Sequence, residues 1–146
     1  MDACTRLCSV ADELAARAVA HRATPRRFLV EFGRAAAGVR TGPLWVLDAA
    51  RGGRNRIAGR GFAPEFDDST RGQARHFAGI VAVAARIGPA PARWASVHIG
   101  RDRPDSADGR LTDAAIEFTR LVASGRLPLG ESSTWIAARL CAAPAA

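Results

Sequence analysis

Titratable side chains of three kinds crowd into one short segment of the chain. Within twelve residues the sequence holds three carboxylates, two guanidiniums and one imidazole, including Glu65, Asp68, Arg75 and His76. Charged groups that crowd together shift one another's pKa values, and groups with shifted pKa values are more frequent at functional sites. The segment is therefore the candidate site of this protein.

The residue types of the segment fit general acid–base chemistry. A hydrolytic site needs a proton-transfer group of tuned pKa, a second acid or base, and a cation that holds an anion. In this hypothesis Glu65 or Asp68 is the acid/base, His76 is the second proton-transfer group, and Arg75 holds the substrate. The alternative is structural: the acids cap a helix, Arg75 pairs with one of them, and His76 bonds a loop carbonyl.

A helix over about 70–86 is expected to position this segment. Apolar residues recur there at helical spacing, and Gly88-Pro89 ends the pattern. Asp68 or Ser69 is predicted to cap the helix. Because alanine and glycine are frequent along it, we expect the helix to be slim and central, with Gly79 at a close contact with a neighbouring helix.

Apolar stripes and turn signals elsewhere predict an all-α fold. The 51–68 stretch is glycine-rich and is expected to be an irregular connection, while 92–99 is ambiguous. Thr24-Pro25 is typical of a helix start. The expected architecture is a single domain over 1–146, a compact bundle of five to six helices around the central one. The other expected helices are 5–21, 25–38, 44–50 (where a strand fits almost as well), 105–124 and 131–142.

The charge of the chain offers a second hypothesis. All 21 basic residues are arginine, and residues 17–60 hold ten of them against two acids, a net charge of +8. The densest part carries Arg51, Arg54, Arg56 and Arg60 without an acid. Such a field favours polyanions. The alternative function is therefore a non-catalytic domain that binds nucleic acid or another polyanion through the 51–60 loop, and the competing interpretation is a solvated loop without a specific ligand.

The three cysteines are predicted to be free thiols. Their odd number and the lack of a secretory signal favour this state, with Cys8 and Cys141 packed as small apolar groups. Cys4 and Cys8 would share a helix face, but no second ligand pair stands near them in sequence. No metal site and no cofactor is therefore predicted.

Targeting signals are not evident in the sequence. No apolar run approaches the roughly 20 residues of a membrane span, and the N-terminus does not follow the signal-peptide pattern. A cytoplasmic location is therefore expected, although an effector exported without a cleaved signal would have the same features. The partner is left open, with a polyanion or another protein as the candidates.

Four short strings between residues 61 and 141 carry a resemblance to known proteins. They are Phe62-x-Pro64-Glu65-Phe66-x-Asp68, Arg75-His76-Phe77, Asp108-x-x-Leu111, and Trp135-Ile136 followed by Leu140-Cys141. This pattern resembles a family of small helical microbial proteins without an assigned activity, and it has a fainter likeness to helical domains of bacterial polymorphic toxins. The resemblance implies an all-α fold and a toxin-like effector as one possibility, and it directs attention to Glu65, Asp68, Arg75 and His76.

Overall fold

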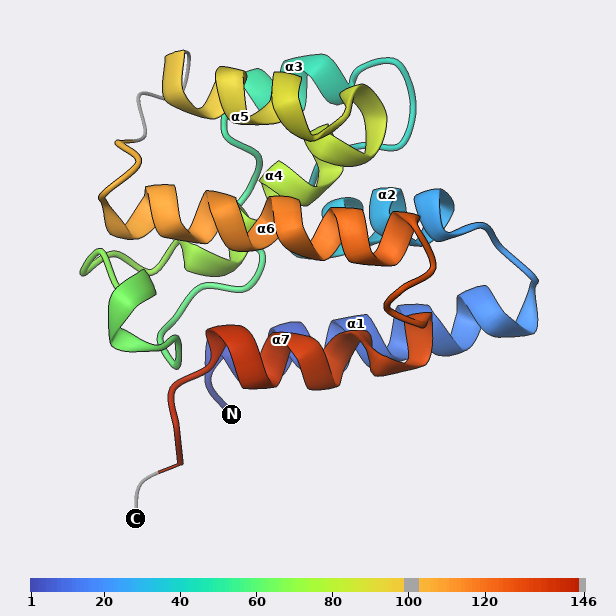
Figure 1. Ribbon diagram of the computed structural model, residues 1–146, viewed down its shortest axis with the longest axis horizontal. Helices are drawn as coiled ribbons and strands as arrows, with labels where there is room; N and C mark the ends of the chain where they lie inside the picture. Colours follow the sequence, from blue (N-terminus) through green and yellow to red (C-terminus); the bar gives the residue numbers. More distant parts are fainter. Residues whose placement is uncertain (99–102, 145–146) are drawn as a thin grey trace.

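The computed structural model describes residues 1–98 and 103–144, and these residues form an all-α fold, as predicted (Figure 1). No helix within these ranges is long and apolar enough to cross a membrane. Short 3-10 turns lie at Pro64–Phe66 and Leu129–Glu131. The helices are α1 (Ala3–Ala20), α2 (Pro25–Ala37), α3 (Trp45–Ala50), α4 (Gln73–Ile87), α5 (Pro89–His98), α6 (Ala107–Ala123) and α7 (Ser132–Leu140).

Helix α4 occupies the central position that the sequence predicts. It packs against α1, α2, α5 and α6, while α7 runs antiparallel to α1 along the opposite side of the bundle (Figure 1). Three phenylalanines join the helices around α4: Phe32 of α2, Phe77 of α4 and Phe118 of α6, with ring centroids 5.6 to 6.1 Å apart. Burial of aromatic and aliphatic side chains from all these helices is the main stabilising contribution.

The close helix contact involves a different glycine from the one expected. Gly79 is partly exposed, and a Cβ atom there would meet nothing within 4 Å. At Gly33 of α2, a Cβ would lie 2.4 Å from the Cβ of Ala82 in α4. The prediction for Gly79 was wrong because composition shows that α4 is slim but not which of its faces meets α2.

Helix α4 begins later than expected and without the predicted cap. Its first residue is Gln73, and Gly72 precedes it without a side-chain cap. Asp68 instead accepts a hydrogen bond from the backbone N–H of Thr70, and Ser69 adopts a left-handed backbone with φ 66°. Asp side chains that bond the backbone two residues further on compete with helix formation. Elsewhere the predicted cap at Thr24 is confirmed, because its hydroxyl accepts from the N–H of Arg27 at 3.1 Å.

The ambiguous stretch after α4 forms helix α5 through residue 98, and residue 99 lies outside the described residues. Gly88 ends α4 with φ 91°, which a residue with a side chain rarely adopts. Pro89 and Pro91 then fall in the first turn of α5, where a missing N–H costs little. The two prolines therefore mark the boundary between α4 and α5 and do not prevent α5 from forming.

The prediction of free thiols was wrong for Cys4 and Cys141, which form a disulfide across 137 positions of sequence. The antiparallel packing of α7 on α1 brings the end of α7 to the first turn of α1 (Figure 1). Cys8 remains a free, half-buried thiol. Sequence separation concealed the pairing, because only the docking of α7 makes the two residues neighbours.

Candidate functional site

The acidic segment divides between two neighbours in the folded protein. Glu65 turns toward α7, where its Oε1 lies 3.3 Å from Nη1 of Arg139, and its side chain is 53% exposed. Its backbone carbonyl also accepts a hydrogen bond from Nε of Arg110 in α6 at 2.8 Å. Glu65 thus ties the 3-10 turn to α6 and α7, a role that fits the structural interpretation.

Asp68 faces the start of α4 and the start of α6. One carboxylate oxygen accepts from Oγ1 of Thr70 at 2.6 Å and from Nε2 of Gln73 at 2.8 Å. Burial opposes the charge on Asp68, but hydrogen bonds with Thr70 and with the Asp108 side chain outweigh it, so the pKa of Asp68 lies below its ordinary value.

His76 lies one turn further along the same contact between helices. Its Nε2 is 2.8 Å from Oγ1 of Thr112 in α6, and that hydroxyl is 3.1 Å from the hydroxyl of Ser96 in α5. Thr112 and Ser96 are both buried. Asp108 and Thr112 are four residues apart and share one face of α6. The structure thus brings Asp68 and His76 to one line of polar contacts, hereafter the α4–α6 seam (Asp68, Gln73, His76, Asp108 and Thr112).

The ion pair expected for Arg75 is absent from the residues that the structure describes. Arg75 is half-buried, and its Nη2 lies 3.1 Å from the position that a Cβ on Gly72 would occupy. The guanidinium therefore covers the turn before α4 without neutralising a carboxylate. Of the four predicted site residues, Asp68 and His76 share the seam, Arg75 flanks it, and Glu65 points toward α7.

Three seam residues were not predicted as site residues: Gln73, Asp108 and Thr112. Gln73 is 3% exposed, and its Oε1 has no hydrogen-bond partner among the described residues. A signal did exist, because Gln73 precedes the buried Phe77 by four positions and so falls on the apolar stripe of α4. A polar residue on such a stripe is worth examining, since buried polar groups are normally hydrogen-bonded.

A second region gathers positive charge around a hollow of about 880 Å³ between the end of α1, the outer face of α2 and the end of α4. Glu31 is its lining carboxylate. Hereafter this region is the arginine groove. Its arginines are Arg17, Arg22, Arg26, Arg27, Arg34 and Arg86.

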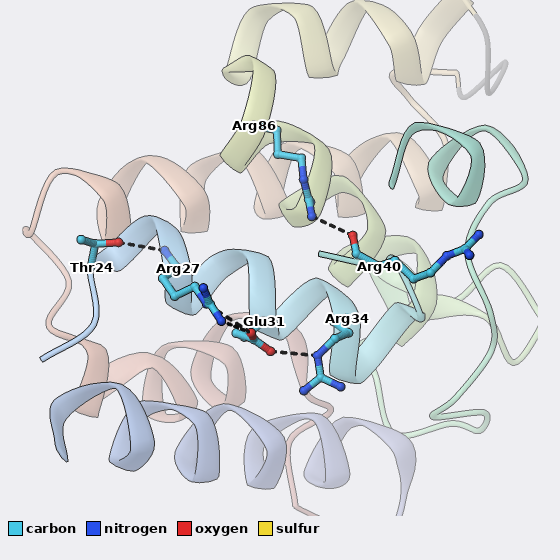
Figure 2. Close-up of polar contacts among 6 residues, drawn as sticks. All are labelled: Thr24, Arg27, Glu31, Arg34, Arg40 and Arg86. Atoms are coloured by element: carbon cyan, nitrogen blue, oxygen red, sulfur yellow. Dashed lines mark hydrogen bonds and ion pairs between the residues drawn. The ribbon is translucent and has the colours of Figure 1, made fainter. Parts of the chain in front are cut away.

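Figure 2 shows how the single carboxylate of the groove is used. Glu31 lies between Arg27 and Arg34 on one face of α2, with ion-pair distances of 3.2 and 2.8 Å. The hydrogen bond from Arg34 and the charges of both arginines lower the pKa of Glu31, although burial opposes this shift. One negative charge thus serves two arginines, and Arg17 pairs with Glu13 of α1 at 3.0 Å. Among the described residues, the positive excess of the groove therefore comes mainly from Arg22, Arg26 and Arg86.

Arg86 is the most constrained cation of the groove. Its guanidinium lies 4.9 Å from the ring centre of Trp45 and donates to the carbonyl of Ala82 at 2.9 Å. It also donates to the carbonyl of Arg40 at 2.9 Å (Figure 2). Burial and the nearby charge of Arg26 both lower the pKa of Arg86. Because the side chain is fixed in a field of like charge, an anion that enters the groove gains a preorganised guanidinium without displacing a carboxylate.

The 51–60 loop continues this positive surface at the far end of α2. Arg54 and Arg56 flank Gly38, where an added Cβ would lie 3.0 Å from Cβ of Arg54 and 3.1 Å from Nε of Arg56. Buried Ile57 anchors the loop, while its four arginines are exposed. By contrast, Arg40 is neutralised by Asp48, whose pKa falls to about 2 because Arg40 donates to it from both side chain and backbone. No sequence motif predicted the arginine groove. The signal that the sequence did contain was the net charge of +8 over residues 17–60.

Comparisons of the chain with protein-family models, with curated proteins and with solved structures find no match. The resemblance to small helical microbial proteins therefore stays a prediction.

Proposed function

We propose that this protein binds, along the outer face of α2, a polyanion that carries phosphate groups. Nucleic acid is the first class of ligand to test. The observation that carries the proposal is the arginine groove, where six arginines and one carboxylate line a single hollow of about 880 Å³. Guanidinium groups bind phosphate in a forked geometry and remain charged at any working pH. The exposed arginines of the 51–60 loop extend the same surface.

The fold leaves several arginine charges of the groove without a carboxylate partner among the lining residues. Burial lowers the pKa of Arg86, and the nearby charge of Arg26 lowers it further, while Glu31 is shared between Arg27 and Arg34. A bound phosphate would relieve the repulsion between Arg26 and Arg86 and release counterions from the nucleic acid. The stretch of α2 from Arg27 to Gly38 spans about 16 Å, long enough for contacts with several phosphates of one strand.

The test is binding of a fluorescein-labelled oligonucleotide, single-stranded and duplex, followed by anisotropy over a range of salt concentrations. The double variant Arg22→Ser with Arg26→Ser removes two arginines of the groove. We expect weaker binding and a shallower salt dependence, by about 0.9 in slope per lost contact for duplex and about 0.7 for a single strand. No binding by the parent protein at low salt would overturn the proposal.

A matched control comes from two arginines that do not line the groove. Arg93→Ser with Arg103→Ser removes the same net charge from α5 and from the segment before α6. This control should bind almost as tightly as the parent. Equal losses in both double variants would mean that net charge alone attracts the nucleic acid. The fourfold variant Arg51→Ser, Arg54→Ser, Arg56→Ser and Arg60→Ser then measures the contribution of the loop.

A second candidate function is acid–base hydrolysis at the α4–α6 seam. The observation that favours it is the contact between Asp68 and Asp108, one turn from the hydrogen bond between His76 and Thr112. Carboxyl groups in contact separate into an acid and a base, and a histidine can supply a second proton transfer. In this proposal Asp68 replaces Glu65 as the principal acid/base, and Arg75 holds the anionic substrate.

The labelled oligonucleotide also serves as the first polymeric substrate for this second candidate. Seam and groove are about 15 Å apart along α4, from His76 to Arg86, so a bound strand can reach both. Asp68→Asn and His76→Asn should abolish cleavage while binding persists, with Glu65→Gln as the control that keeps activity. Cleavage that survives both seam variants, or no cleavage by the parent, would exclude hydrolysis of this substrate at the seam.

A further inference from the structure

A third sulfur lies beside the disulfide that joins the two ends of the chain. Cys8 follows Cys4 by one turn of α1, and its Sγ is 3.9 Å from the Sγ of Cys141, while Cys141 is bonded to Cys4. Cys8 is half-buried, whereas Cys4 is fully buried. A thiol this close to a disulfide sulfur needs only a small rotation of the side chains to attack it.

We propose that Cys4, Cys8 and Cys141 form a thiol–disulfide exchange site, in which the disulfide moves between the first and second turns of α1. The thiolate of Cys8 attacks Sγ of Cys141, the Cys8–Cys141 bond forms, and the Cys4–Cys141 bond breaks. Cys4 leaves as a thiolate and takes up the proton that Cys8 released. One disulfide and one thiol are present before and after the step, so the step needs no oxidant and no reductant.

The backbone around the three sulfurs lets the exchange act on a larger part of the fold. Ala3 donates its N–H to the carbonyl of Arg60 at 2.9 Å, and Ala142 donates to the carbonyl of Gly61 at 2.8 Å. The disulfide therefore fastens both chain ends at the point where the 51–60 loop returns to the core. Exchange would move the attachment of the C-terminal segment by one turn, about 6 Å, along α1.

The rate of exchange depends on the small fraction of Cys8 that is ionised. Burial raises the pKa of the Cys8 thiol, and the carboxylates of Asp12 and Asp2 raise it further. The neutral thiol therefore prevails at neutral pH, and incubation at pH 8.5 is the condition that allows the reaction to proceed on a laboratory timescale.

Trypsin separates the three cysteines, because it cleaves after Arg6, Arg17 and Arg139. The full-length oxidised protein is incubated in its native state at pH 8.5, blocked with N-ethylmaleimide in denaturant at mildly acidic pH, digested without reduction and analysed by mass spectrometry. Before incubation we expect peptide 1–6 linked to peptide 140–146. During incubation this link should decline, while a link between peptides 7–17 and 140–146 grows to a constant fraction.

Two variants make the test independent of the wild-type equilibrium. Cys4→Ala should close a Cys8–Cys141 disulfide when oxidised, and Cys8→Ser should close only Cys4–Cys141. Circular dichroism melting checks that each variant is folded. The proposal is overturned if folded Cys4→Ala retains two free thiols under conditions that fully oxidise Cys8→Ser, or if the wild-type protein shows only the 1–6 link after incubation.

Discussion

The α4–α6 seam and the arginine groove both gather polar side chains, but the fold satisfies them differently. In the seam, Asp68 accepts from Thr70 and Gln73, and His76 bonds Thr112, so most polar atoms have a partner within the protein. In the groove, Glu31 serves Arg27 and Arg34, and Arg17 pairs with Glu13 of its own helix. Arg26 and Arg86 donate to backbone carbonyls, which leave their positive charges in place. Polar side chains whose hydrogen bonds are made within the protein can have a purely structural role. Clustered positive charges without matching carboxylates are better explained by an anionic ligand.

The comparison also shows why crowding in sequence is a weak guide to function. The acidic segment is the most mixed stretch of charge in the chain, yet its members disperse to α6, α7 and the start of α4. The groove is assembled from α1, α2 and α4, and no short window of sequence contains it. Variants can separate the scaffold that both regions share from the chemistry of each region.

The largest effect should come from the contact that holds α2, with its arginines, against α4. Gly33→Ala places a Cβ 2.4 Å from Ala82 Cβ and 3.2 Å from its Cα, so backbone must move. We expect a loss of about 3 kcal/mol, near the upper end of the usual range for overpacking. Gly79→Ala is the matched control: it faces open space and should stabilise the protein by up to about 1 kcal/mol. Denaturant unfolding measures both, and equal signs would refute the assigned contact.

The next largest effect is the stabilisation of the folded protein by a bound oligonucleotide, which should depend on the groove and not on the seam. An oligonucleotide that binds only the folded protein, at 100 times its Kd, should stabilise the fold by about 2.7 kcal/mol. Arg22→Ser with Arg26→Ser should lose this protection. Its melting temperature without ligand should change little, because removing the charge of Arg26 beside Arg86 offsets the loss of the hydrogen bond from Arg26 to the carbonyl of Ala85. Thermal melting with and without the oligonucleotide tests this, and full protection of the double variant would contradict it.

A smaller effect is expected at the seam. Asp68→Ala removes the main hydrogen-bond acceptor of the buried Gln73 amide. The carboxylate of Asp67, 3.4 Å from Nε2 of Gln73, remains as a weaker acceptor. We therefore expect a loss of about 1–2 kcal/mol in the free energy of unfolding. The pKa of Asp68 is lower in the folded state than its ordinary value of 3.8, so its stabilising contribution is present above that value. The contribution is lost as the pH falls through the lowered pKa.

Melting curves collected down to acidic pH test this dependence. The parent protein should lose stability more steeply below pH 3.8 than Asp68→Asn, which carries no titrating group at this position. Parallel stability profiles for the two proteins would show that Asp68 does not contribute through its charge.

The smallest effects on stability are expected for Glu65 and Arg75, the two predicted site residues that lie outside the seam. Glu65→Gln weakens an exposed ion pair with Arg139, and Arg75→Ala removes a guanidinium that has no ion pair among the described residues. Each should change the free energy of unfolding by less than about 1 kcal/mol. A larger loss for Arg75→Ala would restore the hypothesis of a buried pair with an acid.

Residue type and spacing determined the helices and their order. Helical periodicity predicted the apolar faces of α1, α2, α4, α6 and α7, and the cap at Thr24 followed from local chemistry. These features depend on residues within one or two turns of each other, so a linear sequence contains the information. The positive excess of residues 17–60 was likewise a property of the chain itself.

Tertiary structure decided what depends on the relative placement of the helices. The pairing of Cys4 with Cys141, the tight contact at Gly33 and the joining of Asp68 to Asp108 connect residues that are distant in sequence. The antiparallel docking of α7 and the rotation of each helix about its axis fix these contacts. Periodicity defines which face of a helix is buried but not which residue it meets, so only the packed fold reveals the seam, the groove and the three neighbouring sulfurs.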